Sequence, residues 1–183
     1  SYHGRMPQTA HSPQHSASAP ALALTIAGSE ATGGAGAQAD LKTFQELGVF
    51  GIVALTCIVS FDPKDDWNHR FFPVPTEILQ QQLDAIQGDY PERLRTVKLG
   101  MQGSPEVIRT SAAALRRAEW DHVVLDPVLI CKGQEPGHAL DTDQALKAEL
   151  LPLATFTTPN HFETEQLSGM TVRSVEDLTA AAR

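Results

Sequence analysis

Several polar segments of the chain follow apolar ones, at points where a ligand could bind. The Gly-rich segment 28–36 (GSEATGGAG) follows a short apolar run, and its backbone N–H groups can approach an anion or a polar ligand closely. Asp126 directly follows the apolar segment His122–Leu125, and Cys131 and Lys132 come shortly afterwards. A cysteine beside a lysine has more thiolate character than a buried one. Each feature also has a structural interpretation, as a flexible turn, a turn carboxylate or a solvated lysine.

Asn160 and Glu163 stand at the start of a predicted helix, after Thr157-Thr158-Pro159. Asn followed three residues later by Glu is typical of a capping box, in which both side chains bind helix N–H groups. The alternative is that the amide and carboxylate organise water and Mg²⁺ around a phosphate. The spacing is the same in both interpretations, so the sequence leaves them open.

Aromatic residues gather in the polar segment 60–74, which includes Trp67, His69, Phe71 and Phe72. These rings could cover a ligand, or they could anchor a loop to the core. By contrast, Cys57 lies within an apolar run, where a cysteine acts as a small core hydrophobe.

Other common site motifs are weak or missing. Gly34, Gly36 and Ala39 satisfy GxGxxA, and Asp62 could serve as the ribose-binding acid of a dinucleotide site. In such a site the first glycine follows the strand at once, whereas Gly28 to Gly33 intervene here. The hypothesis of an NAD(P) oxidoreductase therefore rests on this motif alone. The sequence has no GxxxxGK[ST] phosphate loop, and His69, His122, His138 and His161 show no HxH or HxxxH metal spacing.

The composition of the 183 residues favours a soluble domain that acts on small molecules. Hydrophobic residues make up 42% of the chain, enough for a sizeable core, and the net charge of −8 disfavours nucleic acid or an anionic membrane as partner. No apolar run is long enough to span a membrane. The two cysteines form no CxxC motif, which is compatible with a reducing cytoplasm.

The hydrophobic pattern alternates between strands and helices. This alternation predicts an α/β fold with a mostly parallel sheet and a ligand site at the carboxyl ends of its strands. The predicted strands are 22–27, 49–59, 96–99, 122–125 and 154–157. The predicted helices are 38–47, 75–88, 104–118 and 141–151, followed by helices that open at Asn160 and Ser174. Residues 1–20, rich in His, Ser and Pro, are expected to be a disordered leader or a cloning remnant.

Taken in order, the motifs resemble the ribokinase-like vitamin kinases, which include the pyridoxal (vitamin B6) kinases and the hydroxymethylpyrimidine or phosphomethylpyrimidine kinases of thiamine synthesis. The resemblance covers residues 22–183 and rests on the segments GSEATGGAGAQADLKTFQELG, VALTCIV, VKLGMQGS, VVLDPVLICKG and LLPLATFTTPNHFETEQLSG. It implies a three-layer α/β/α sandwich and ATP- and Mg²⁺-dependent phosphorylation of a hydroxymethyl group on a pyridine or pyrimidine ring. It also suggests a homodimer.

The resemblance further implies roles for individual residues. The expected substrate-binding residues are Gly28, Glu30, Asp40, Phe61, Met101 and Cys131. Asp126, Lys132 and Asn160 are expected near the ATP phosphates, and Asp126 and Glu163 near Mg²⁺. Residues 21–183 correspond to roughly the first two-thirds of such a kinase domain. The family's Gly-rich anion hole and catalytic base are expected beyond Arg183, so this chain alone is expected to be inactive.

Two departures from the family pattern bear on the substrate. Phe61 stands where the thiamine-type kinases usually carry Gln, and an apolar ring cannot hydrogen-bond the pyrimidine amino group. This favours a pyridine substrate, to whose aldehyde the Cys131 thiol could add reversibly. Glu30 stands where the family more often has Asp, which changes the reach of its carboxylate. Two alternatives remain: a thiamine-pathway kinase, and a non-catalytic ligand-binding protein that kept the substrate half of the site.

Overall fold

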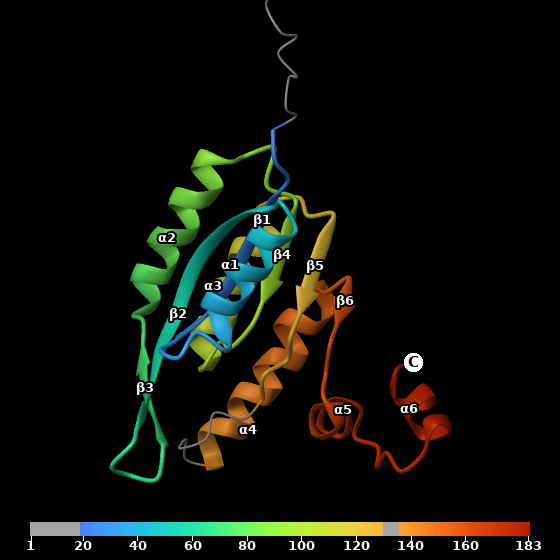
Figure 1. The fold of residues 1–183 in the computed structure, drawn as a ribbon. Helices are drawn as coiled ribbons and strands as arrows, with labels where there is room; N and C mark the ends of the chain where they lie inside the picture. The colour runs from blue at the N-terminus through green and yellow to red at the C-terminus, as the bar shows by residue number, and fades with distance from the viewer. Residues whose placement is uncertain (1–18, 130–135) are drawn as a thin grey trace, which may run out of the picture.

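The computed structural model describes residues 19–129 and 136–183, which form a sheet with helices on both faces (Figure 1). The sheet has six strands in the order β3-β2-β1-β4-β5-β6, and every neighbouring pair except β2–β3 is parallel. The predicted α/β fold with a mostly parallel sheet is therefore confirmed. The strands are β1 (Leu22–Glu30), β2 (Phe50–Asp62), β3 (Asn68–Pro73), β4 (Thr96–Leu99), β5 (His122–Leu125) and β6 (Phe156–Thr157).

Helices follow most of the strands, as parallel pairing requires. The helices are α1 (Gly36–Glu46), α2 (Thr76–Asp89), α3 (Pro105–Arg116), α4 (Pro136–Ala145), α5 (His161–Ser168) and α6 (Val175–Ala181). α4 continues through a π-helical turn, Leu146–Leu150, into a 3₁₀ turn, Leu151–Leu153. The predicted start of α3 is confirmed, because the Ser104 hydroxyl accepts a hydrogen bond from the Val107 N–H at 3.3 Å.

α1 covers one face of the sheet, and α2, α3 and α4 cover the other (Figure 1). Leu24 and Ile26 of β1 are fully buried in a core that includes Leu79 of α2 and Ile108 of α3. Thr25 lies between them in sequence and faces the opposite way, toward α1, as the alternation of a strand requires. β1 is thus covered on both faces.

The segment 60–74, predicted as a polar connection, forms part of a β-hairpin instead. β2 continues to Asp62, and β3 returns antiparallel to it at the edge of the sheet, so that Asp62 pairs with Asn68. The turn between them has positive φ angles at Asp66 (47°) and Trp67 (59°). An edge strand faces solvent along one side and carries polar residues there, which hid the strand in the sequence pattern.

Two other predicted boundaries are wrong. Asp141 was predicted to cap a helix, but the helix begins at Pro136 and Asp141 lies inside it. Proline fits the first helical turn because it has no N–H to leave unpaired. The strand predicted at 154–157 is shorter and spans Phe156–Thr157.

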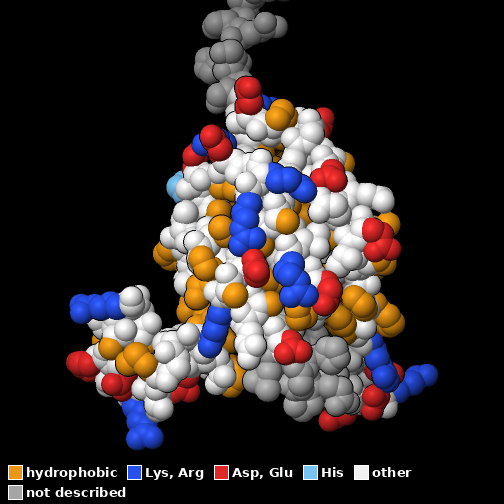
Figure 2. Space-filling model, turned by 180° about the vertical axis from the view of Figure 1, so that it is seen from behind, with side chains coloured by type: hydrophobic (Ala, Val, Ile, Leu, Met, Phe, Trp, Pro, Cys, Tyr) orange, Lys and Arg blue, Asp and Glu red, His pale blue; other side chains and the backbone are white. Residues whose placement is uncertain are grey.

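Figure 2 shows the face of the molecule seen from behind the view of Figure 1, with Lys and Arg side chains interspersed among acidic ones. Ion pairs join neighbouring helices: Arg116 binds Glu149 at 2.9 Å, and Arg117 binds Asp84 at 2.8 Å. These two arginines are therefore paired with acidic side chains. In residues 19–129 and 136–183, no helix combines the length and apolar character that crossing a bilayer requires.

Candidate active site

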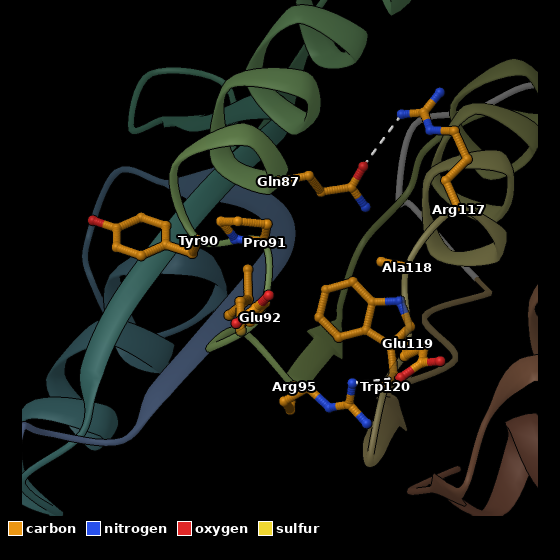
Figure 3. A pocket seen from close by; sticks show the side chains of 10 residues that line it. Gln87, Tyr90, Pro91, Glu92, Arg95, Arg117, Ala118, Glu119 and Trp120 are labelled. Atoms are coloured by element: carbon orange, nitrogen blue, oxygen red, sulfur yellow. Dashed lines mark hydrogen bonds and ion pairs between the residues drawn. The ribbon is translucent and has the colours of Figure 1, made fainter.

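The structure contains a cavity at each end of the sheet, and their linings differ in chemistry. The cavity at the amino ends of β4 and β5 measures about 360 Å³ and is lined by Gln87, Arg95, Arg117 and Trp120, among others (Figure 3). Arg95 binds Glu119 and Asp121, both at 2.9 Å, and Arg117 binds Gln87. The hydrogen bond from Arg95 also lowers the pKa of Asp121.

Both arginines of this cavity are thus paired with acidic or amide side chains. Its ion pairs join the start of β4 to the loop before β5. We interpret it as a structural junction. In parallel α/β sheets, ligands bind at the opposite edge, where the strands have their carboxyl ends.

The cavity at the carboxyl edge measures about 180 Å³ and is mostly apolar. It lies between the end of β1, the start of α1, the β2–β3 hairpin and the loop after β4. The lining residues are Gly28, Ser29, Glu30, Ala35, Val59, Phe61, His69, Phe71 and Met101. Four of the residues expected to bind substrate, Gly28, Glu30, Phe61 and Met101, therefore meet at one cavity.

Met101 is fixed from behind the cavity by residues of β2. The Thr56 hydroxyl donates to the Met101 carbonyl oxygen at 2.6 Å, and the Cys57 Sγ lies 3.6 Å from the Met101 Sδ. Cys57 is fully buried, and burial raises the pKa of its thiol, which confirms its interpretation as a small core hydrophobe. A Cβ at Gly28 would lie 2.6 Å from the Cys57 Sγ, so only glycine fits between strand and thiol.

Gly36, at the first position of α1, is sterically constrained as well. Its φ is +62°, and a Cβ there would lie 2.3 Å from the Gly28 carbonyl oxygen. We expect Gly36→Ala to lower the free energy of unfolding by about 1–3 kcal/mol from backbone strain, with a further loss from the clash. Denaturant unfolding measures the change. The control is Gly88→Ala in α2, where nothing lies within 4 Å of the added Cβ, and which should be neutral or stabilising. Equal stability of the two variants would contradict the constraint.

The Gly-rich loop is organised by the carboxylate of Glu30. Its oxygens accept hydrogen bonds from the Thr32 N–H at 2.7 Å, the Thr32 hydroxyl at 2.8 Å and the Gly34 N–H at 3.0 Å. The Thr32 bond is the main reason why the pKa of Glu30 is lowered. N–H groups that the sequence suggested for a ligand are thus taken by a side chain of the protein. Glu30 lines the cavity and also shapes its wall.

Glu30 should make stability depend on acid pH. Its folded pKa lies below the usual 4.5, so its contribution is present above that pH and is lost as pH falls through the folded pKa. Between about pH 5 and pH 3, the free energy of unfolding should fall more steeply in the wild type than in Glu30→Gln. Glu46→Gln, at an exposed position at the end of α1, should keep the wild-type slope. Parallel slopes for all three proteins in urea titrations would rule out this role.

Asp40 lies outside the cavity lining, between α1 and the sheet. Its Oδ2 accepts hydrogen bonds from the Thr25 hydroxyl at 2.6 Å and from the Lys98 ammonium at 3.1 Å. Lys98 Nζ also lies 3.6 Å from Oδ2 of Asp126. The expected contact of Asp40 with a substrate ring stays a prediction. Sequence reasoning missed Lys98, although a lysine inside the apolar strand VKL was a signal.

Asn160 and Glu163 form the capping box that their spacing predicted. Asn160 Oδ1 accepts from the Glu163 N–H at 2.9 Å, and Glu163 Oε2 accepts from the Asn160 N–H at 2.8 Å. A backbone hydrogen bond from Leu129 also reaches the Glu163 carboxylate. Burial raises the pKa of Glu163, and the charge of Asp126 adds to the increase, against the lowering effect of the Asn160 N–H. The cap therefore holds a buried carboxylate near Asp126.

The carboxylates of Asp126 and Glu163 fit the protein ligands that Mg²⁺ usually takes. Magnesium is usually bound by one or two carboxylates and by substrate phosphates, and it keeps several waters. Within the described part of the chain, no group of three or more His, Cys, Asp or Glu side chains could hold a metal ion without such help. Cys131, expected to bind the substrate, and Lys132, expected near the ATP phosphates, lie outside the described residues.

The aromatic segment lines the cavity and packs against neighbouring parts of the fold. His69 and Phe71 line the cavity, and the rings of Phe61 and His69 meet edge to face at 4.7 Å. Gly103, at φ +82°, lets the loop after β4 approach the Phe71 ring, because a Cβ there would lie 2.6 Å from it. Trp67 is exposed at the turn of the hairpin.

The dinucleotide interpretation finds no support in this geometry. Asp62 binds Arg70 across the hairpin at 3.1 Å and accepts from the Lys64 N–H, so it closes the turn.

A comparison with protein families decides the class. The profile of the family described as phosphomethylpyrimidine kinase matches residues 30–183. The chain belongs to this phosphomethylpyrimidine kinase family. The family profile and the fold thus agree with the resemblance drawn from the motifs.

Relatives of this family member include pyridoxine kinases and hydroxymethylpyrimidine/phosphomethylpyrimidine kinases. A pyridoxine kinase of Bacillus subtilis is 46% identical over 88% of this chain and 59% of its own length. A hydroxymethylpyrimidine/phosphomethylpyrimidine kinase of the same organism is 42% identical over 87% of this chain and 58% of its own length. The chain therefore spans about three-fifths of the length of these curated relatives.

Solved structures confirm the ribokinase-like architecture of this family member. The ADP complex of Bacillus subtilis pyridoxal kinase matches with a TM-score of 0.82 and 44% identity, over 90% of this chain and 61% of that one. Staphylococcus aureus pyridoxal kinase in complex with AMP-PCP and pyridoxal matches with a TM-score of 0.78 and 41% identity, over 90% and 57%.

Proposed function

We propose that the protein phosphorylates the hydroxymethyl group of pyridoxal, pyridoxine or pyridoxamine with ATP. The observation that carries this proposal is the apolar cavity at the carboxyl edge, with Phe61 in its wall. A pyridine ring buries well against such a surface, whereas the amino group of a pyrimidine would lose its hydrogen bonds there. The similarity to pyridoxine kinases at 40–46% identity supports the same substrate class.

In the proposed mechanism, residues of this chain position two reactants. The substrate ring occupies the cavity against Met101 and Phe61, which brings its hydroxymethyl group toward the carboxyl ends of β4 and β5. Asp126 and Glu163 would hold Mg²⁺, and the ion would supply positive charge to neutralise the transferring phosphate. Asn160 and Lys132 act near the ATP phosphates. Because phosphoryl transfer depends chiefly on positioning and charge neutralisation, these residues suit the reaction.

The rest of the proposal follows the family resemblance. The catalytic base and the anion hole belong to the part of such a kinase that lies beyond the span matched here. A homodimer in the cytoplasm is the assembly and location we propose, and light scattering of the purified protein tests the dimer.

A second candidate is phosphorylation of hydroxymethylpyrimidine, which the similarity to the Bacillus subtilis kinase of that name favours. A coupled ATPase assay of the complete protein with pyridoxal and with hydroxymethylpyrimidine separates the two. We expect the higher kcat/KM with pyridoxal. Turnover of the pyrimidine alone would replace the first proposal by the second, and pyridoxal binding without turnover of either would indicate a non-catalytic binding protein.

A further inference from the structure

Lys98 is a charged residue in the interior part of the sheet. Its neighbours on β4, Val97 and Leu99, are fully buried in the core formed with α2 and α3. Lys98 points to the other face, where α1 lies, and only 22% of its side chain is exposed. Removing most of an ammonium side chain from water is costly unless charged partners compensate. Its position therefore calls for an explanation.

The ammonium group lies between two carboxylates from different parts of the fold. It is 3.1 Å from Oδ2 of Asp40 on α1 and 3.6 Å from Oδ2 of Asp126 after β5. The Asp40 oxygen also accepts a hydrogen bond from the hydroxyl of the fully buried Thr25. Asp40 is thus held by the sheet, and it fixes the end of the lysine side chain.

The absence of a side chain at Gly100 makes room for the ammonium group at this position. A Cβ at Gly100 would lie 3.0 Å from the Lys98 Nζ, so glycine at this position leaves the space that the lysine fills. Asp126 is 38% exposed and follows the last residue of β5, where few packing contacts fix a short side chain. The Lys98 ammonium is bound to Asp40 on its other side, so it is the group best placed to hold the Asp126 carboxylate.

Asp126 also lies near a second carboxylate, that of the buried Glu163. Two like charges repel, and repulsion would push the more exposed group, Asp126, away toward solvent. We propose that Lys98 is a positioning residue: anchored by Asp40, it holds the Asp126 carboxylate at the sheet edge, in place to bind the nucleotide and its metal. This inference deepens the proposed function and rests on it.

The competing explanation is purely structural. Lys98 could serve only to neutralise Asp40, whose side chain is 16% exposed and whose charge would be costly to leave unpaired. In Lys98→Met, Asp40 is left without a cation. The double variant Lys98→Met/Asp40→Asn removes that unpaired charge but still leaves Asp126 without its cation, so the two explanations predict different properties for it.

The test measures two quantities in the complete protein: the thermal midpoint, and the Kd for ADP with Mg²⁺ by calorimetry without any vitamin substrate. Lys98→Met should lower the midpoint and weaken nucleotide binding roughly 10- to 100-fold, the usual effect of removing a partner of a metal ligand. The double variant should recover the midpoint but not the affinity. Lys98→Arg should retain most of the affinity. Arg109→Met, which removes one charge from an exposed site on α3, should match the wild type in both.

Each outcome decides between the explanations. Recovery of both midpoint and affinity in the double variant would show that Lys98 only neutralises Asp40. Wild-type affinity in Lys98→Met would also overturn the positioning role. If the wild type itself binds no ADP, the proposed function fails and this role fails with it. If Lys98→Met does not fold, Lys98→Arg and the double variant still give the comparison.

Discussion

Replacing Asp126 by Asn in the complete protein is expected to lower kcat about 100- to 1000-fold, the scale of losing one group that stabilises charge in a transition state. The substitution keeps the size of the side chain but removes the charge that faces Lys98 and that we propose binds Mg²⁺. It also removes the repulsion from Glu163, so thermal stability should change little or rise. Steady-state assays over a range of Mg²⁺ concentrations measure the effect.

Asp89→Asn provides the matched control for this prediction. Asp89 is exposed at the end of α2, at the other end of the molecule from the carboxylate pair, and its loss should leave kcat unchanged. An Asp126→Asn protein with wild-type kcat at low and high Mg²⁺ would show that the carboxylate pair has no part in the reaction.

Replacing Phe61 by Gln is expected to shift substrate preference toward the pyrimidine. Glutamine offers a carbonyl oxygen to an amino group that the phenyl ring leaves unpaired, and a buried unpaired group costs about 1–3 kcal/mol. The ratio of kcat/KM for hydroxymethylpyrimidine to that for pyridoxal should therefore rise between about fivefold and 150-fold. Competition assays with both substrates measure this ratio directly.

Phe72→Gln separates a cavity effect from a general effect of losing an aromatic ring in the hairpin. Phe72 lies on β3 and is 57% exposed, outside the cavity lining. Its substitution should leave the preference unchanged. An unchanged ratio in Phe61→Gln, with the thermal midpoint preserved, would remove Phe61 from the determinants of specificity.

Local sequence patterns predicted the strands and helix starts that depend on nearby residues. Strands buried on both faces, such as β1, are read from continuous apolar runs, and the starts of α3 and α5 from cap residues at Ser104 and Asn160. β3 was missed because an edge strand is only partly apolar. The start of α4 was placed too late, because Asp141 has the character of a cap residue although it lies inside a helix.

The candidate site could be predicted in part only. Gly28, Phe61 and Met101 were expected to bind the substrate because the family resemblance implied those roles, and no local pattern in the sequence did. The partners of Glu30 could not be foreseen, because whether loop N–H groups meet a ligand or a nearby carboxylate depends on the path of the backbone. The link between Lys98 and Asp126 joins two strands, and no spacing in the sequence encodes it.

Because of the antiparallel β2–β3 hairpin, the cavity wall and the carboxylate pair lie on different parts of the sheet edge. One wall of the cavity comes from this hairpin, whereas Asp126 and Glu163 are positioned by β5 and α5 on the far side of β1 and β4. Mutations in the hairpin can therefore reshape the cavity without moving the carboxylates. Under the proposed function, a change of preference between pyridine and pyrimidine substrates could arise within this strand pair, while Asp126 and Glu163 stay under separate selection.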